Sequence, residues 1–234
     1  MALLAQISDA HLIELDLSGR PAADWVRLAF LSPYRPSRAA SRARNLAGAL
    51  ERARRAGADH VAFTGDLTED AAPAQFELFA QLVGESGFKP EQVTVIPGNH
   101  DAYRGRAAYD EQARTTLAAV SHAEGARFEL DGVQVVPLDS TLDQHYVRAA
   151  GLLGPEQRRH FTDVSSPTLV LQHHPPIPHS ARGLGWFQEL VDVCQVEDAV
   201  AAAPDVFVLH GHVHHHRDLA GARAVVGAAE GRAG

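Results

Sequence analysis

The stretch HVAFTGDLTE, residues 60–69, decides the fold, because an apolar run ends here at a turn that carries two carboxylates. Short apolar runs bounded by turn residues are typical of buried strands. Four further runs of this kind lie along the chain, at residues 3–7, 93–97, 168–172 and 206–209. Each of them also leads into Asp, Asn or His. The pattern predicts buried strands that end in polar turns.

Helical patterns separate these strands. Ser37 can cap a helix that Gly57 ends, and its apolar face is expected to comprise Ala43, Leu46, Leu50 and Ala53. Further helices are expected near residues 73–83, 106–120, 155–161 and 196–203. The dipeptide Asp131-Gly132 lies between the short runs 127–130 and 133–138, where it favours a β-hairpin turn. Strands that alternate with helices, together with a hairpin, indicate an α/β protein with mixed sheets.

Length and composition limit the class of protein. With 234 residues, 45% of them hydrophobic, the chain fits a single domain over residues 1–234, of which residues 228–234 are expected to fray. The formal net charge of −8 argues against general nucleic-acid binding. No apolar stretch is long enough to span a bilayer, and the N-terminus lacks the features of a signal peptide. Because Cys194 is the single cysteine, a Cys-based zinc site is excluded and a cytoplasmic location is expected.

The polar ends of the strands carry the chemistry, and in chain order they read ISDAH, TGDLTE, PGNHD, QHHP and HGHVH. In open α/β sheets, ligands bind just outside the carboxyl ends of the strands. Carboxylates, imidazoles and amide oxygens suit divalent ions such as Zn²⁺, Mn²⁺ or Fe²⁺. A carboxylate can bridge two such ions, and ions about 3.5–4 Å apart clamp both sides of an in-line phosphoryl displacement. The pattern therefore predicts a two-metal site.

Five motifs follow one another between residues 9 and 214, namely Asp-x-His, Gly-Asp-x-x-Glu, Gly-Asn-His-Asp, His-x-Pro and Gly-His-x-His. In this order they resemble the calcineurin-like metallophosphoesterases. Within that superfamily they are most similar to the bacterial branch related to class III cyclic-nucleotide phosphodiesterases. The resemblance covers nearly the whole chain and implies a four-layer α/β/β/α sandwich of mixed sheets, with the site at its rim.

The resemblance also implies which residues hold the ions. Two sets of three ligands would each hold one divalent ion, and these sets are Asp9, His11 and His214 for one ion and Asn99, His173 and His212 for the other. Asp66 would bridge both ions together with a hydroxide. The ions implied are Mn, Fe, Zn or Co, and no organic cofactor is expected.

The resemblance implies roles for two residues beside the ligands, and other neighbours are expected to have structural roles. His100 matches the histidine that contacts the phosphate and protonates the leaving group. Glu69 occupies the position at which the phosphoprotein phosphatase branch has an aspartate that orients this histidine. Asp101 is expected to cap the following helix. The ligand role assigned to His173 could instead belong to the adjacent His174, and supporting or surface roles are expected for His210, His215 and His216.

Residues 24–34 are unusually apolar for a connection between motifs, and the arginine-rich residues 35–55 follow them. A basic amphipathic segment can contact a membrane surface. The preferred interpretation is a lid loop packed beside the site, followed by a helix with a solvated basic face. Peripheral membrane contact through residues 24–55 is the alternative.

The sequence therefore predicts an enzyme, a metal-dependent phosphoric ester hydrolase with a small-molecule substrate. Cyclic nucleotides or glycerophosphodiesters are the favoured substrates, cleaved by in-line attack of the bridging hydroxide with His100 as general acid. The alternatives are a nucleotide-sugar lipid pyrophosphatase at the membrane surface, a phosphomonoesterase, and a binding module on a degenerate phosphoesterase fold. The short tail after His214 departs from the family pattern and leaves the oligomeric state open.

Overall fold

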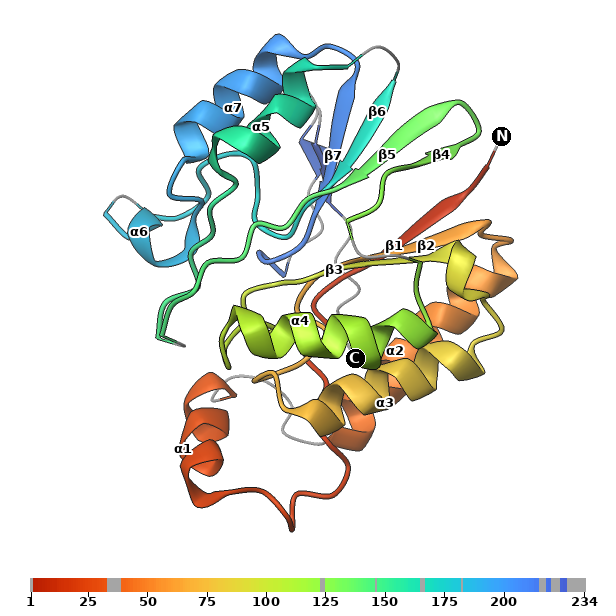
Figure 1. Ribbon diagram of the computed structural model, residues 1–234, viewed down its shortest axis with the longest axis vertical. Helices are drawn as coiled ribbons and strands as arrows, with labels where there is room; N and C mark the ends of the chain where they lie inside the picture. The colour runs from red at the N-terminus through yellow and green to blue at the C-terminus, as the bar shows by residue number, and fades with distance from the viewer. Residues whose placement is uncertain are drawn as a thin grey trace.

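Two β-sheets lie face to face, and helices cover the outer side of each (Figure 1). The computed structural model of the protein describes residues 2–32, 39–122, 125–145, 147–164, 167–181, 183–214, 218–219 and 224–226. The layers follow the order helix, sheet, sheet, helix, which confirms the predicted architecture. Side chains of both sheets meet in a small apolar cluster between them, made of Ala62, Ile96, Val135, Leu171 and Leu209.

The first sheet holds three parallel strands in the order β1-β2-β3. They are β1 (Leu4–Ile7), β2 (His60–Thr64) and β3 (Val93–Ile96). Its outer face carries α2 (Ala39–Arg55), α3 (Pro73–Glu85) and α4 (Arg106–Thr115). The largest apolar core lies between this sheet and its helices, and Phe63, Phe76 and Phe79 are fully buried in it.

The second sheet is mixed and has the order β4-β5-β6-β7-β9-β8. Its strands are β4 (Phe128–Leu130), β5 (Val133–Pro137), β6 (Thr168–Leu171), β7 (Val206–His210), β8 (Asp218–Leu219) and β9 (Ala224–Val226). The pairs β4/β5 and β8/β9 are antiparallel, and the others are parallel. The helices α5 (Gly154–Thr162) and α7 (Val193–Ala202) pack on its outer face around Phe161 and Val196.

Local sequence patterns explain most of these elements. The predicted apolar face of α2 is buried, and Gly57, with a φ of 76°, reverses the chain after the helix. Asp131 and Gly132 have φ angles of 51° and 82°, as the predicted hairpin turn requires. A β-hairpin therefore joins β4 to β5, and short 3₁₀ turns occupy Pro90–Gln92 and Leu117–Ala119.

The structure differs from the sequence-based expectations in its connections. Most of the predicted lid loop is a helix, α1 (Ala22–Leu31), and α6 (Gly185–Gln188), β8 and β9 were not foreseen. The buried side of α1 combines Leu28 with Asp24, which lies beside Arg104, whereas Trp25 and Phe30 are about half exposed. The proposed cap Ser37 and the tail 228–234 lie outside the described residues. Among the described helices, none is both long and apolar enough to cross a membrane.

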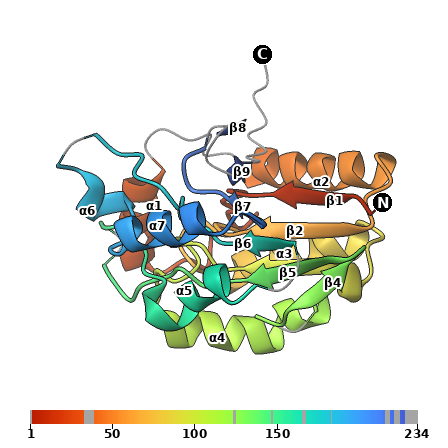
Figure 2. The ribbon, with the colours of Figure 1, turned by 90° about the horizontal axis from the view of Figure 1, so that it is seen from above.

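The direction of the strands determines where a site can form. Seen from above, the arrowheads of β1 and β5 point toward the end of the molecule where α1 and α6 lie (Figure 2). Because β2 and β3 run parallel to β1, and β6 and β7 run parallel to β5, the carboxyl ends of six strands face this end. The polar motifs all follow these strand ends, with α1 and α6 beside them.

A buried histidine far from these strand ends is expected to make stability depend on pH. His60 bonds Thr94 Oγ1 through Nε2 at 2.8 Å and stacks on Phe128, and burial together with nearby His122 lowers its pKa from 6.5 to about 4. Between these values the unfolded chain binds the proton that the folded protein excludes, so stability falls as the pH falls. The variant His60→Gln, which keeps a partner for Thr94, should lack this contribution. The contribution to the slope of the unfolding free energy against pH is at most about 1.4 kcal/mol per pH unit.

The measurement is urea unfolding of wild type and variant in chelator between pH 7 and pH 4. The difference in unfolding free energy between the two proteins should shift in favour of the variant as the pH falls. Parallel curves would show that His60 titrates normally in the folded protein.

Candidate metal centre

The seven predicted metal ligands come together at the shared carboxyl edge of the two sheets. The five strand ends supply Asp9 and His11 after β1, Asp66 after β2, Asn99 after β3, His173 after β6, and His212 and His214 after β7. The histidines after β7 are half-buried, and the other five residues are buried. Two groups of predicted ligands share Asp66, and a third possible group joins His11 to Glu69 and His100.

The first group surrounds the ring of His11. Its Nε2 lies 3.2 Å from Nε2 of His214, 3.6 Å from Oδ2 of Asp66 and 3.9 Å from Oδ1 of Asp9. Nε2 of His214 lies 3.3 Å from the same oxygen of Asp9. Two ring nitrogens and two carboxylates thus point at one small volume, where a cation would satisfy all four.

The second group is oriented by hydrogen bonds on its outer side. Nδ1 of His173 donates to the Thr64 carbonyl oxygen at 2.8 Å, and Nε2 on the other side of the ring faces Oδ2 of Asp66 at 3.4 Å. A ring nitrogen held in this way is the usual arrangement behind a metal-ligating histidine. Burial opposes the charged ring, yet the negative charges of Asp66 and Asp9 raise the pKa of His173 to about 9. A field that attracts a proton so strongly also attracts a divalent cation.

Asn99 presents its oxygen to the same place. Its Nδ2 donates to the hydroxyl of Tyr103 at 2.7 Å, so Oδ1 points inward, 3.2 Å from Nε2 of His173 and 3.1 Å from Nδ1 of His212. Nε2 of His212 is buried and has no hydrogen-bond partner among the described residues. Tyr103, which orients the amide, lies four residues after Asn99 in the turns that follow β3, and this short separation in sequence could have indicated it.

Asp66 links the two groups. Its Oδ2 faces His11 and His173, and its Oδ1 accepts the backbone N–H of His100 at 2.9 Å. Burial favours the neutral acid, but the neighbouring histidines outweigh it and hold the pKa of Asp66 well below its usual range. The carboxylate is therefore charged and central, which is the placement that a bridging ligand needs.

His100 lies beside the two groups with one ring nitrogen already occupied. Nδ1 donates to the backbone carbonyl oxygen of Glu69 at 2.6 Å, and Nε2 faces Oδ2 of Asp66 at 3.9 Å. Because a carbonyl oxygen can only accept, Nδ1 carries a hydrogen and Nε2 is the atom that can gain or lose a proton. Glu69 thus orients His100 through its main chain, a contact that the sequence did not predict.

The Glu69 carboxylate has contacts of its own. It is fully buried, pairs with Arg42 of α2, accepts the Ser32 hydroxyl at 2.8 Å and lies 3.6 Å from Nδ1 of His11. Arg42 and Ser32 were not foreseen as parts of the site. The side chain of Glu69 therefore supports a candidate ligand.

The backbone of the ligand residues is unusual. Of the seven described non-glycine residues with positive φ, five are candidate ligands, namely Asp9, His11, Asp66, His212 and His214. Asp and His tolerate this left-handed region better than most residues, and such backbone strain concentrates at functional sites. Backbone hydrogen bonds stabilise part of this strained backbone. The His11 N–H, for example, donates to the Asp66 carbonyl at 2.9 Å.

Asp101 does not cap the following helix, which corrects the prediction. It is fully buried, and its carboxylate accepts the backbone N–H groups of Leu67, Thr68 and Gly98. It thereby ties the turn after β2 to the turn after β3. Gly98 permits this approach, because a Cβ there would overlap the Asp66 carboxylate.

His174 points away from the ligand groups. Its Nδ1 bonds Ser140 Oγ at 2.8 Å, and its Nε2 donates to the Ala149 carbonyl at 3.1 Å. Burial and the charge of His173 lower its pKa to about 3, so the ring is neutral. The geometry favours His173 as the ligand. His210 is buried with Nδ1 on the Gly211 carbonyl, and His215 and His216 lie outside the described residues.

The donor set determines which ions fit. Each group combines carboxylate oxygen with imidazole nitrogen, and the second adds an amide oxygen, which suits borderline and hard divalent ions. Cys194, the one cysteine, is exposed on α7 and plays no part. The residues therefore fit divalent metal ions.

Comparison with known proteins identifies a matching family. A family model for calcineurin-like phosphoesterases matches residues 2–216. A "Probable cyclic nucleotide phosphodiesterase" of Rhodococcus erythropolis is 30% identical over 163 residues, 67% of this chain and 52% of the relative. The "3′,5′-cyclic adenosine monophosphate phosphodiesterase CpdA" of Escherichia coli is 27% identical over 183 residues, 69% of this chain and 56% of that protein. The chain thus spans about half the length of the curated relatives it matches.

Solved structures share the fold. A dimetal phosphatase from Danio rerio has a TM-score of 0.69 at 15% identity, with 95% of this chain and 86% of that chain covered. A protein of Thermus thermophilus has a TM-score of 0.55 at 16% identity, with 95% and 87% covered.

Proposed function

Because the chain belongs to the calcineurin-like phosphoesterase family, we propose that it is a two-metal phosphodiesterase that hydrolyses cyclic nucleotides. The observation that carries the proposal is the Asp66 carboxylate, which is shared by two groups of ligands. The names of the relatives support the substrate class. The cytoplasmic location and the single-domain organisation remain predictions from the sequence.

The proposed ligand sets are those of the sequence analysis. Asp9, His11 and His214 would hold one ion, Asn99, His173 and His212 would hold the other, and Asp66 would contact both. Mn, Fe, Zn or Co suit these donors. Bound there, the pair would supply the positive charge and activated water for an in-line displacement at phosphorus.

His100 supplies the proton in this proposal. Its Nδ1–H is fixed on the Glu69 carbonyl, so Nε2 points to the side on which Asp66 lies. A proton held at Nε2 neutralises the charge that develops on the departing oxygen. The Glu69 carbonyl keeps the ring in that orientation throughout.

The test is reconstitution of metal-free protein with Mn²⁺, followed by elemental analysis and a substrate screen. We expect two ions per chain and faster hydrolysis of 3′,5′-cyclic AMP than of glycerophosphodiesters, nucleotide sugars or phosphomonoesters. One ion or none would overturn the two-metal assignment, and preference for another ester would overturn the substrate class.

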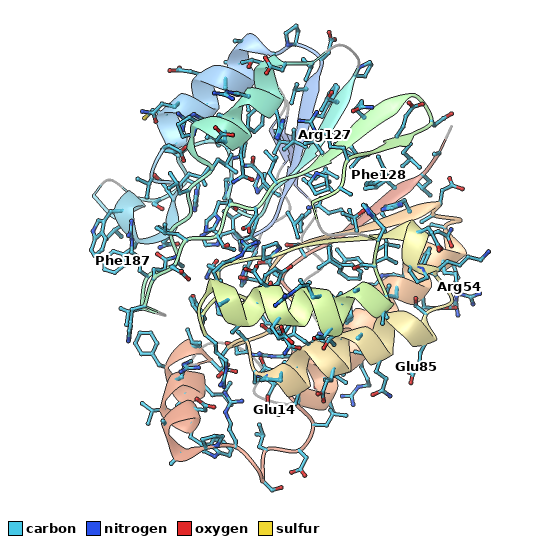
Figure 3. All side chains as sticks on the ribbon, in the orientation of Figure 1. Glu14, Arg54, Glu85, Arg127, Phe128 and Phe187 are labelled. Atoms are coloured by element: carbon cyan, nitrogen blue, oxygen red, sulfur yellow. The ribbon has the colours of Figure 1, made fainter. Side chains whose placement is uncertain are left out.

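A pocket linked to the centre through His174 supports the proposal of a substrate with a planar base. It measures about 370 Å³ and is lined by Val147, Ala149, Leu184, Phe187 and Gln188. The carbonyl of Ala149 accepts the hydrogen bond of His174, whose ring lies 4.7 Å from that of His212, so His174 connects the pocket lining to a candidate ligand. Phe187 is located on α6, at the same end of the molecule as α1 (Figure 3). Its ring packs against that of Trp186 at a centroid distance of 3.8 Å, so a base would stack on this aromatic pair, and the Gln188 amide would supply hydrogen bonds to the base.

Phe187→Ala is therefore expected to raise KM for cyclic AMP about tenfold, because stacking of a base on an aromatic ring contributes about 1–3 kcal/mol. The KM for a glycerophosphodiester, which has no ring, should stay within about twofold. Trp25→Ala, which removes an exposed aromatic side chain of α1, is the matched control. Equal effects on both substrates would place the base elsewhere.

The alternative of a lipid-linked pyrophosphate substrate is favoured by one observation. The outer face of α1 exposes Trp25, Val26 and Phe30, with exposed fractions of 45%, 67% and 52%. Such a face can rest on a bilayer. Sedimentation with anionic vesicles distinguishes the two proposals, because the cyclic-nucleotide enzyme should stay in the supernatant.

A further inference from the structure

One arginine of α2 is buried. Arg42 is 6% exposed, whereas Arg44, Arg52, Arg54 and Arg55 of the same helix are exposed. A buried guanidinium is unfavourable unless it is paired and hydrogen-bonded. The contacts of Arg42 must therefore compensate for the burial of its charge.

These contacts converge on His11. Nη1 of Arg42 donates to the backbone carbonyl oxygen of His11 at 2.6 Å and also pairs with Oε2 of Glu69. Nη2 lies 3.4 Å from the hydroxyl of Ser32, which in turn donates to Oε1 of Glu69 at 2.8 Å. The guanidinium thus connects the main chain of His11 to the Glu69 carboxylate, which lies beside the His11 ring.

The first effect of these contacts is on the backbone. His11 has a φ of 45°, in the left-handed region. Its N–H is fixed by the Asp66 carbonyl, and its own carbonyl is fixed by Arg42. The peptide is held on both sides, so the direction of the side chain is defined.

The second effect is on the ring. Oε2 of Glu69 lies 3.6 Å from Nδ1 of His11, and Nε2 on the opposite side of the ring faces Asp66 and Asp9. A carboxylate behind Nδ1 favours a hydrogen there and leaves Nε2 as the ligand atom. Arg42 fixes this carboxylate at the required place, and its charge compensates that of Glu69.

We propose that Arg42 is a positioning residue of the metal centre, which holds His11 in its ligating conformation through the His11 carbonyl and the Glu69 carboxylate. This inference rests on the proposed two-metal function. It gives α2, a helix otherwise exposed on its basic face, a direct part in metal binding.

The test is calorimetric titration of metal-free protein with Mn²⁺ alone. In Arg42→Ala, the ion that His11 binds should weaken about 10- to 100-fold, the usual effect of removing a partner behind a ligand. The other ion should bind as in the wild type. Arg44→Ala, on the exposed side of the same helix, is the matched control and should bind both ions normally.

Chemical rescue separates positioning from general damage. Free guanidinium, below denaturing concentrations, should restore the weakened ion in Arg42→Ala and leave the wild type unchanged. If Arg42→Ala does not fold, Arg42→Lys takes its place: a single ammonium cannot reproduce the fork of a guanidinium, so the same ion should still weaken.

Two outcomes would overturn the proposal. Unchanged binding of both ions in the variant refutes it, and so does equal weakening of both ions without rescue. Wild-type protein that binds fewer than two ions would instead refute the proposed function. The two failures are therefore distinguishable.

Discussion

Replacement of Asp66 by asparagine is expected to abolish binding of both ions and to reduce turnover by about 10³-fold or more. Oδ2 of Asp66 faces His11 in one ligand group and His173 in the other, so a single charge serves both. Asparagine keeps the shape, tolerates the left-handed φ of 53°, and can still accept the N–H of His100 at Oδ1. The variant therefore removes the charge and replaces the oxygen that faces both histidines with an amide NH2 group, while the shape is kept. Loss of several kcal/mol of stabilisation at phosphorus corresponds to this rate.

The matched control is His214→Asn, which changes a ligand of one group in the same kind of backbone conformation. It should lose one ion and retain the other, and its activity should fall less than that of Asp66→Asn. Elemental analysis and steady-state kinetics measure both quantities. Retention of two ions by Asp66→Asn would refute the bridging role.

His100→Ala is expected to keep both ions and to lose activity in proportion to how poorly the leaving group departs. General acid catalysis contributes about 10²–10⁴-fold. An alkoxide such as the ribose oxygen needs a proton, whereas p-nitrophenolate hardly does. We therefore expect a loss of about 10²-fold or more on cyclic AMP and a distinctly smaller loss on bis(p-nitrophenyl) phosphate.

The control is the comparison between the loss of activity on cyclic AMP and the loss on bis(p-nitrophenyl) phosphate. Equal losses with unchanged metal content would make His100 a residue that positions phosphate. Loss of an ion would make it a ligand. Because Nδ1 is fixed on Glu69, His100→Gln, which keeps some hydrogen-bonding capacity, should show the same difference between substrates.

The strand-end motifs were predictable, because apolar runs and the turns after them are local properties of the sequence. The pattern placed Asp9, Asp66 and His212 at one edge, and the structure brings them together. Helix α1 was not predictable from periodicity, because its buried polar residue Asp24 depends on Arg104, far away in the sequence.

Arg42 shows a different limit. It lies four residues before Leu46 and seven before Ala49, which places it on the buried face of α2. The sequence thus shows that Arg42 shares a helix face with Leu46 and Ala49. A cluster of arginines nevertheless indicates a solvated surface unless the residues that pair with them are known. Those partners, Glu69 and the carbonyl of His11, come from the turns after β2 and β1. Only the assembled fold reveals them.

The left-handed backbone of the ligand residues restricts which amino acids can replace them during evolution. For most L-residues this conformation is unfavourable by roughly 1–2 kcal/mol, whereas Asn, Asp, His and Gly accept it readily. A descendant that loses its ions is thus expected to drift toward Asn or Gly at Asp9, His11 and His214, and away from Val or Ile. Such a lineage would keep the fold without the metal chemistry. The residue types at its former ligand positions would still be those that a left-handed backbone conformation accepts.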